Sequence, residues 1–277
     1  MPVNALVCIK QVPDTETKVK VAGDGKRIDP EGIKWIINPY DELAIEVALR
    51  LKEKLQGSVT LITAGPARCE EALRTGLAMG ADKAIHVKDD LAGADGFVVA
   101  RVLAKAVQAA GAQFDLILAG KAAIDDDLSI VPVALAEALN LPNVSTVVAI
   151  EVDTAGKKGR ARRQIEGAEE VVDFPLPAVI SVQKGIAVPQ GSNPAPIHEP
   201  RYPTLPGIMQ AKKKEVKPLT VAQLGLPADA LKSRTKVAEM SLPPPRAAGK
   251  LIEFETPQEA AQKLIKALRE EAKLLQL

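Results

Sequence analysis

Residues 114–139, FDLILAGKAAIDDDLSIVPVALAEAL, decide the fold. The first part, FDLILAG, is a short apolar run, which is typical of a buried parallel strand. In the last part, LSIVPVALAEAL, apolar residues recur at helical spacing, Pro132 lies in the first turn and Ser129 is the predicted N-cap. Three acids, Asp125–Asp127, occupy the loop between them. Such a loop lies where α/β sheets bind ligands, because free N–H groups of the following helix point into the crevice.

The same alternation of strand and helix extends in both directions along the chain. Further strands are predicted at 5–10, 59–65, 83–87, 145–152 and 176–182, and further helices at 39–55, after Pro66 and at 94–110. Strands that alternate with helices in this way predict a parallel sheet with right-handed crossovers. The fold class is therefore α/β: a Rossmann-like parallel sheet flanked by helices.

The second half of the chain predicts additions to this sheet. Two polar-apolar runs on either side of residues 166–168 predict a small antiparallel pair with a glycine-containing turn. Residues 185–206 are rich in proline and predict a long loop. We predict one α/β domain over residues 1–210 and an extended C-terminal arm over 211–277. The capping box at 256–259 predicts a last helix that runs almost to Leu277.

Composition narrows the functional classes. The 36 basic and 35 acidic residues nearly cancel, so no global field recruits nucleic acid. Only two cysteines occur, each in an apolar pattern, which fits a reducing compartment. No charged lead followed by an apolar stretch and a cleavage site is seen at the N-terminus. We therefore predict a soluble, cytoplasmic protein of bacterial type.

A second predicted helix N-terminus lies at residues 38–42, NPYDE. Asn38 suits the N-cap and Pro39 the first helical position, so the stretch is explained by helix capping alone. Alternatively Tyr40 offers a flat surface to a ring system beside the 121–127 loop. Helix N-termini after Gly65 and after Asp127 would point into the same crevice, and together they predict an adenine nucleotide site.

The acidic loop is ambiguous. Carboxylates repel phosphate, so a phosphate is expected on backbone N–H groups beyond Asp127, while one carboxylate accepts hydrogen bonds from ribose or adenine. A metal site lacks a second ligand cluster. His86 and His198 fit no catalytic triad, and neither GxGxxG nor GxxxxGK[ST] occurs. An enzyme that acts through its own side chains is therefore disfavoured.

Residues 199–209, EPRYPTLPGIM, combine prolines with large apolar side chains. The segment is too proline-rich for a predicted helix. One interpretation is a loop pinned onto the core. The other is a recognition segment, in which proline lowers the entropy cost of binding and a leucine or methionine enters a partner's pocket. Three lysines at 212–214 would then attract an acidic partner, or simply form a solvated surface.

Taken together, these stretches resemble the beta (small) subunit of electron-transfer flavoproteins over nearly the whole chain. The matching pieces are VCIKQVPD (7–14), NPYDELAIEVALRLKE (38–53), AGPARCEEALRTGLAMGADKAIHV (64–87), LAGKAAIDDD (118–127), LPAVISV (176–182) and EPRYPTLPGIMQAKKK (199–214). The resemblance implies a heterodimer whose larger alpha subunit holds the redox-active FAD near the interface. The beta subunit then binds a structural AMP, or a second FAD in the electron-bifurcating branch.

The resemblance also implies roles for particular residues. The nucleotide site would be lined by Cys8, Asn38, Pro39, Tyr40, Asp41, Ala64, Gly120, Ala123, Asp126 and Ser129. Partner recognition would fall to Tyr202, Leu205, Ile208, Met209 and Lys213, with Leu205 as the anchor on acyl-CoA dehydrogenases. The 211–277 arm would wrap the alpha subunit.

Two departures from the family pattern leave alternatives open. Residues 129–132, SIVP, stand where many relatives have polar residues that contact phosphate, so a second FAD or an empty site remains an alternative to AMP. Residues 185–198 look like an insertion before the EPRY segment. The implied function is an electron carrier in fatty acid β-oxidation, from acyl-CoA dehydrogenases to a membrane quinone-linked oxidoreductase, with the redox chemistry done by FAD. A nucleotide-hydrolysing α/β protein would need a glycine-rich phosphate loop, which is not found.

Overall fold

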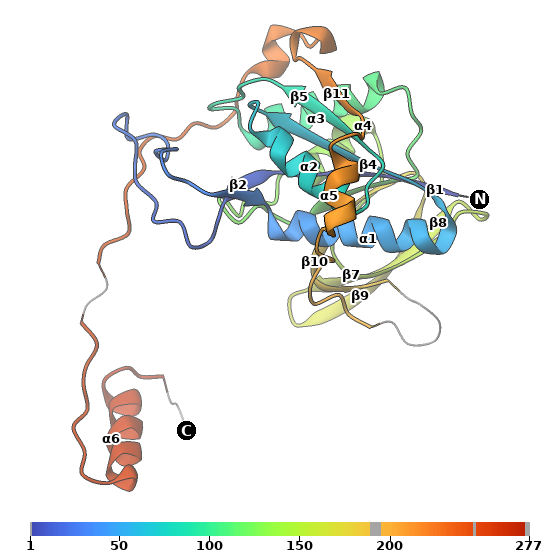
Figure 1. Ribbon diagram of the computed structural model, residues 1–277. Coiled ribbons are helices and arrows are strands. Elements are labelled where there is room, and N and C mark those ends of the chain that lie inside the picture. The colour runs from blue at the N-terminus through green and yellow to red at the C-terminus, as the bar shows by residue number, and fades with distance from the viewer. Residues whose placement is uncertain (1, 189–194, 246–247, 275–277) are drawn as a thin grey trace. The chain divides into compact units, whose positions relative to one another are not determined.

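The computed structural model describes residues 2–188, 195–245 and 248–274 (Figure 1). These residues fall into two compact units, Met1–Glu239 and Met240–Leu277. The first unit holds the sheet and all but one of the helices found in the described ranges. The second holds a single helix, α6 (Pro257–Glu270), none of whose side chains is buried.

The first unit is built around a nine-stranded sheet with the order β11-β5-β4-β1-β6-β10-β7-β8-β9. All pairs from β11 to β7 are parallel, and the pairs of β8 with β7 and with β9 are antiparallel. The strands are β1 (Val3–Cys8), β4 (Gly57–Gly65), β5 (Lys83–Lys88), β6 (Leu116–Gly120), β7 (Asn143–Asp153), β8 (Lys158–Ile165), β9 (Ala168–Pro175), β10 (Ala178–Ala187) and β11 (Val216–Leu219). The predicted α/β class with a small antiparallel addition is confirmed.

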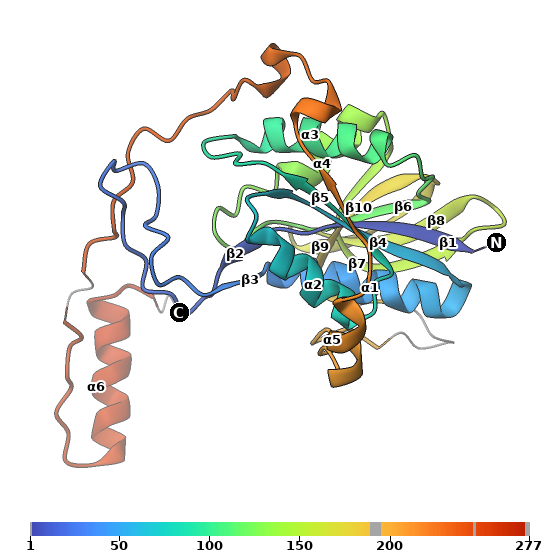
Figure 2. The same cartoon turned by 45° about the horizontal axis from the view of Figure 1, so that its top comes forward.

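Helices cover both faces of this sheet (Figure 2). On one face lie α1 (Pro39–Leu55) and α2 (Cys69–Met79), and on the other α3 (Gly96–Ala109) and α4 (Val131–Leu139). Successive residues of β6 therefore enter opposite cores: Leu118 packs in the cluster of α1 and α2, and Ile117 in that of α3 and α4. Burial on both faces explains why these strands are continuous apolar runs instead of alternating ones.

The chain reverses its direction across the sheet between β1 and β6. From β1 it proceeds through β4 to β5, and then returns to place β6 on the other side of β1. A separate antiparallel pair, β2 (Gln11–Pro13) with β3 (Trp35–Ile37), follows directly from the end of β1. A reversal of this kind opens a crevice at the carboxyl ends of the two strands.

The predicted N-cap at Ser129 is wrong. Helix α4 begins at Val131, Ile130 is in the N-cap position, and no side chain caps it. The preceding loop curls first: the Asp127 N–H bonds to the Ala123 carbonyl oxygen, and Ser129 adopts a left-handed conformation with φ of 55°. Ser129 therefore lies outside the helix, although Pro132 lies in its first turn as predicted.

The prediction that residues 199–209 cannot form a helix is also wrong. Helix α5 (Leu205–Ala211) begins after Thr204, whose hydroxyl accepts a hydrogen bond from the Gly207 N–H at 3.2 Å. Pro206 falls in the first turn, where a helix needs no N–H donor. The proline content was therefore no obstacle, because the proline inside the helix sits at its tolerated end.

The long loop before α5 is shorter than predicted. Strand β10 continues to Ala187, and the Ile197 N–H donates to the Ile186 carbonyl oxygen at 2.7 Å. This hydrogen bond and the β-bridge between Ala187 and Pro196 tie the two flanks of the expected insertion together, and Ile197 is buried. Residues 189–194, the centre of that insertion, lie outside the described residues.

The C-terminal part contains one strand that was not predicted. β11 adds to β5 in the first unit, and Pro218 within it is compatible with an edge strand. The two 3₁₀ turns that follow, η1 (Ala222–Leu224) and η2 (Ala228–Leu231), also belong to the first unit. The capping box before α6 is confirmed, with Thr256 accepting from the Glu259 N–H at 3.3 Å, but the helix ends at Glu270.

Helices α2 and α5 cap each other's C-termini. Arg74 of α2 donates to the carbonyl oxygens of Ala211 and Lys214, both at 2.9 Å. In return Lys214 donates through Nζ to the carbonyl oxygens of Leu77 and Ala81 at 2.9 and 2.6 Å. Cations at helix C-termini satisfy carbonyls that lack a helical partner and complement the helix dipole. Lys214 is thus a structural residue and is not available for partner attraction.

We predict that Lys214→Met lowers the free energy of unfolding by about 1–2 kcal/mol, because two charged hydrogen bonds are lost and two carbonyl oxygens lose their donor. Lys213→Met is the matched control, since Lys213 is exposed, and it should change stability by less than about 0.5 kcal/mol. Urea unfolding of both variants measures the difference. Equal effects of the two substitutions would contradict the structural role of Lys214.

Candidate functional site

A cavity of about 410 Å³ lies at the carboxyl ends of β1, β4 and β6, where the chain reverses direction. Eight of the ten residues predicted for the nucleotide site line it: Cys8, Asn38, Asp41, Ala64, Gly120, Ala123, Asp126 and Ser129. Pro39 and Tyr40 are not among the lining residues. The structure therefore brings most of the predicted set to one place, while Tyr40 stands beside Lys121, whose Nζ is 5.2 Å from the ring centroid.

Asp41 joins the two strands that bound the cavity. Its buried carboxylate accepts hydrogen bonds from the N–H groups of Lys10 and Gly120, both at 2.8 Å. Lys10 follows β1 and Gly120 ends β6, so one side chain from the first turn of α1 spans the reversal point. The same turn places the carboxylate at the positive end of the helix dipole.

Gly120 is required at this point. A Cβ on Gly120 would lie 2.5 Å from both Asp41 Oδ1 and the Tyr40 Cβ. Any side chain would therefore push α1 away from the end of β6. Gly120 is therefore needed for the close approach of α1 to the end of β6. Its φ is not positive, so its backbone conformation does not itself require glycine.

Asn38 fixes the acidic loop through hydrogen bonds to its backbone. It occupies the N-cap position of α1, yet its side chain makes no cap hydrogen bond. Instead its Nδ2 donates to the Ala122 carbonyl oxygen at 2.9 Å, and its Oδ1 accepts from the Ile124 N–H at 3.2 Å. The amide therefore fixes the start of the 121–130 loop through one donor and one acceptor on the same side chain.

Lys10 partly neutralises the acidic triplet. Its Nζ lies 2.7 Å from Asp125 Oδ1 and 2.9 Å from Asp126 Oδ2. Both pairs are partly exposed, so they contribute little to stability. Their effect is on the field of the cavity mouth, where the loop carries less negative charge toward a phosphate than its sequence suggests.

The sequence analysis missed a second cation at the cavity. Arg68 stacks on Trp35, with 3.5 Å from its guanidinium carbon to the ring centroid, and donates to Gln11 Oε1 at 2.6 Å. Arg68 and Gln11 both line the cavity. Their position in sequence was a usable signal, because Gln11 follows the first strand closely and Arg68 directly precedes α2.

The opposite wall of the cavity is apolar. It is formed by residues of the β5–α3 loop, by α3 and by the start of α4: Leu91, Val99, Leu103, Leu128, Ile130, Val131 and Pro132. The cavity thus has one wall suited to a flat apolar ring and another with two cations and two helix N-termini. This division of apolar and polar groups is what a small-molecule site of mixed polarity requires.

The predicted recognition residues lie on the surface of the first unit. Leu205 is 73% exposed, Tyr202 and Met209 are more than half exposed, Ile208 is also exposed, and Lys213 is exposed at the end of α5. A single exposed leucine does not indicate a binding surface. Here, however, four large apolar side chains are exposed within eight positions, which is typical of an interaction site. We call residues 202–209 the presented segment.

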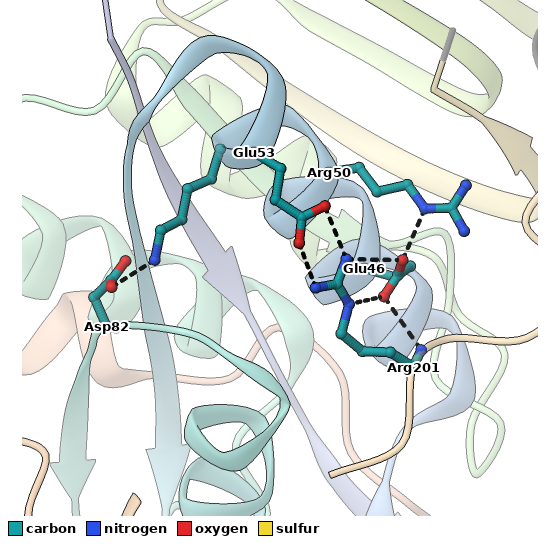
Figure 3. A network of polar contacts seen from close by, with 6 residues as sticks. Glu46, Arg50, Glu53, Asp82 and Arg201 are labelled. Atoms are coloured by element: carbon teal, nitrogen blue, oxygen red, sulfur yellow. Dashed lines mark hydrogen bonds and ion pairs between the residues drawn. The ribbon is translucent and has the colours of Figure 1, made fainter. Parts of the chain in front are cut away.

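Arg201 attaches the presented segment to α1 (Figure 3). Its guanidinium donates to Glu46 at 2.7 Å and to Glu53 at 2.5 Å, and its backbone N–H donates to Glu46 at 3.2 Å. Glu46 is buried and also binds Arg50 at 2.7 Å. Burial would raise the pKa of Glu46, but the hydrogen bonds from Arg201 and Arg50 outweigh burial and lower it. A bidentate clamp of this kind fixes orientation more than it adds stability.

The fold and the cavity define a doubly wound α/β protein whose ligand site lies at the switch point of the sheet. Comparison with known proteins specifies the family. Residues 26–224 match the model of the electron transfer flavoprotein domain. The chain therefore belongs to the electron transfer flavoprotein family, on the beta-subunit branch, as the sequence motifs indicated.

The relatives match along their full length. The electron transfer flavoprotein subunit beta of Bacillus subtilis is 40% identical over 98% of this chain and 100% of its own. That of Syntrophomonas wolfei is 42% identical over 99% of both chains, and the human subunit beta is 38% identical over 94% of this chain and 95% of its own.

The described residues hold neither a membrane-spanning helix nor a metal-binding cluster. In the ranges with known structure, no helix combines the length and apolar character needed to cross a membrane. Within the same ranges, no three His, Cys, Asp or Glu side chains converge as a metal-binding group.

Asp41 provides a pH test of the cavity floor. Burial raises the pKa of Asp41 to about 7, although the N–H groups of Lys10 and Gly120 oppose the rise. The folded state then binds a proton that the unfolded state has released above its ordinary pKa near 4, so stability falls as the pH rises toward 7. We predict that wild type loses about 2–3 kcal/mol relative to Asp41→Asn between pH 5 and 7.5. A stability difference that stays constant over this range in urea unfolding would show that Asp41 is ionised throughout.

Proposed function

We propose that this chain is the scaffold and partner-recognition subunit of a heterodimeric electron carrier, with AMP bound in the switch-point cavity. The observation that carries the proposal is the combination of two features in one unit: a mixed-polarity cavity at the carboxyl ends of β1, β4 and β6, and an exposed Leu205 on a segment clamped by Arg201. The relatives support an alpha partner, because they are named as the beta subunits of electron transfer flavoproteins.

The residues present fit an adenine mononucleotide. The apolar wall that includes Leu91, Val99 and Ile130 suits the adenine ring, and Lys10 and Arg68 suit a phosphate on the other side. The first turn of α4 offers backbone N–H groups as well, one fewer than usual because Pro132 has none. Since no side chain between 129 and 132 other than Ser129 can hydrogen-bond, the two cations carry a larger share of anion binding here.

The FAD expected in the alpha subunit supplies the redox chemistry of the complex. This chain contributes binding and orientation. Its presented segment offers Leu205 to an acyl-CoA dehydrogenase, and electrons then pass to a membrane quinone-linked oxidoreductase. The unit Met240–Leu277, whose helix α6 buries none of its side chains in the chain itself, is proposed to wrap the alpha subunit.

The nucleotide is tested by a cofactor inventory. We expect acid extraction of the purified heterodimer, followed by mass spectrometry and flavin absorbance, to give one AMP and one FAD per heterodimer. Two FAD and no AMP would replace the proposal by the bifurcating alternative, in which a second flavin occupies the cavity. One FAD with no adenine mononucleotide would leave a purely structural subunit.

Leu205→Ala tests the presented segment. Loss of a central apolar anchor costs an interface about 2 kcal/mol or more, so the rate constant kcat/KM for electron transfer from the acyl-CoA dehydrogenase should fall by at least about tenfold. The free energy of unfolding should stay within about 0.5 kcal/mol, because the side chain is 73% exposed.

Val171→Ala is the matched control for Leu205→Ala. Val171 is 64% exposed on β9, away from the presented segment in sequence and strand order. Its kcat/KM should equal that of the wild type. A normal rate for Leu205→Ala, or an equal loss for Val171→Ala, would exclude Leu205 as a specific anchor.

A further inference from the structure

Asp95 connects the wall of the cavity to a segment far along the chain. It lies at the N-cap of α3, and its Oδ1 accepts the Val98 N–H at 3.0 Å. Its other oxygen, Oδ2, accepts the N–H groups of Arg234 and Thr235 at 2.6 and 3.0 Å. The two carboxylate oxygens therefore serve two separate tasks: one caps a helix, and the other holds residues 233–235.

The attachment is reinforced from the other side. The hydroxyl of Ser233 accepts the Asp95 N–H at 3.1 Å and donates to the Gly93 carbonyl oxygen at 3.0 Å. Arg234 lies over the Phe97 ring, with its guanidinium carbon 4.9 Å from the ring centroid. We call these contacts between residues 93–97 and 233–235 the clasp.

The clasp holds residues that form the cavity. Asp90, Leu91, Ala92, Ala94 and Gly96, all in the loop before α3 or at its start, line the candidate nucleotide site. Residues 91–97 of this loop are half-buried or exposed, and Leu91 and Ala94 pack against the apolar core beneath α3 and α4. The clasp adds hydrogen bonds from a segment distant in sequence, so the position of the loop depends on that contact as well.

Gly96 transmits the position of the clasp to the start of α4, which belongs to the same apolar wall of the cavity. A Cβ on Gly96 would lie 3.0 and 3.1 Å from side-chain carbons of Ile130. The loop of the clasp and the start of α4 are therefore packed without spare room. A shift of the loop when residues 233–235 detach would change the cavity on the α3 side and at Ile130 together.

We propose that Asp95 is a positioning residue for the nucleotide site, and that nucleotide binding and closure of the clasp stabilise each other. This inference rests on the proposed nucleotide in the cavity. By linkage, a nucleotide that binds better to the closed form must hold residues 233–235 more firmly, and by the same factor. The first unit ends four residues after the clasp, at Glu239, so the nucleotide would also define where the chain leaves this unit.

Asp95→Asn separates the two tasks of the carboxylate. Asparagine is an equally good N-cap, so α3 keeps its cap on Val98. The amide NH₂ cannot accept the N–H groups of Arg234 and Thr235, so the clasp loses its strongest contacts. Asp229→Asn is the matched control, because it makes the same change of charge on an exposed residue shortly before the clasp.

Two readouts on the heterodimer, from which the bound AMP has first been removed, test the coupling: the Kd for AMP by isothermal titration, and the rate of trypsin cleavage after Arg234. The rate is divided by that after Lys250 in the other unit. In wild type we expect saturating AMP to slow the relative cleavage by about tenfold. In Asp95→Asn we expect the Kd for AMP to rise by about tenfold and the protection to disappear. Asp229→Asn should behave as wild type.

Ser233→Ala provides a second variant if Asp95→Asn does not fold. It removes two hydrogen bonds of the clasp and leaves the cap intact, so it should move both readouts in the same direction by a smaller factor. If Asp95→Asn or Ser233→Ala is cleaved rapidly after Arg234 but binds AMP with the wild-type Kd, the coupling is overturned and the proposed function still stands. Failure of wild type to bind either AMP or FAD would overturn the proposed function, and the coupling with it.

Discussion

The structure depends on one buried carboxylate. Asp41 reaches from the first turn of α1 to the N–H groups that follow β1 and end β6, the two strands between which the chain changes direction. Parallel strands end in unpaired N–H groups, and an α/β sheet must satisfy them where no ligand does. Asp41 does so for the N–H groups of Lys10 and Gly120.

This constraint explains the spacing of the polar residues around it. Asn38, three positions earlier, is brought under the acidic loop and fixes it through Ala122 and Ile124. The loop in turn places Asp125 and Asp126 beside Lys10. The floor of the cavity is thus a single hydrogen-bonded system that starts from one helix turn. Helix α1 also carries Glu46, which binds Arg201 at the start of the presented segment (Figure 3). The same helix therefore positions both candidate sites.

The sequence predicts those parts that local chemistry determines. The apolar runs, the helix starts at Asn38 and Thr256 and the antiparallel pair of β8 and β9 all follow from periodicity and capping. Long-range partners decided the rest. Serine is a residue type favoured at the N-cap. Here, however, hydrogen bonds within the preceding loop, such as that from the Asp127 N–H to the Ala123 carbonyl oxygen, place Ser129 outside the helix, and α4 begins at Val131. Strand β11, with Pro218, becomes a strand only because β5 offers it an edge.

The lysines that follow the presented segment also differ in a way that only long-range contacts determine. By sequence, Lys212, Lys213 and Lys214 are equivalent. In the structure Lys214 turns inward to the carbonyl oxygens of α2, and burial lowers its pKa, whereas Lys213 stays exposed. The α2–α5 contact therefore uses one lysine to hold the helix that carries Leu205 and leaves its neighbour exposed. A partner that approaches this face meets an apolar helix start fixed at both ends, by Arg201 before it and Lys214 after it. Such a surface loses little conformational entropy on docking, which is the condition under which a single leucine can serve as an anchor.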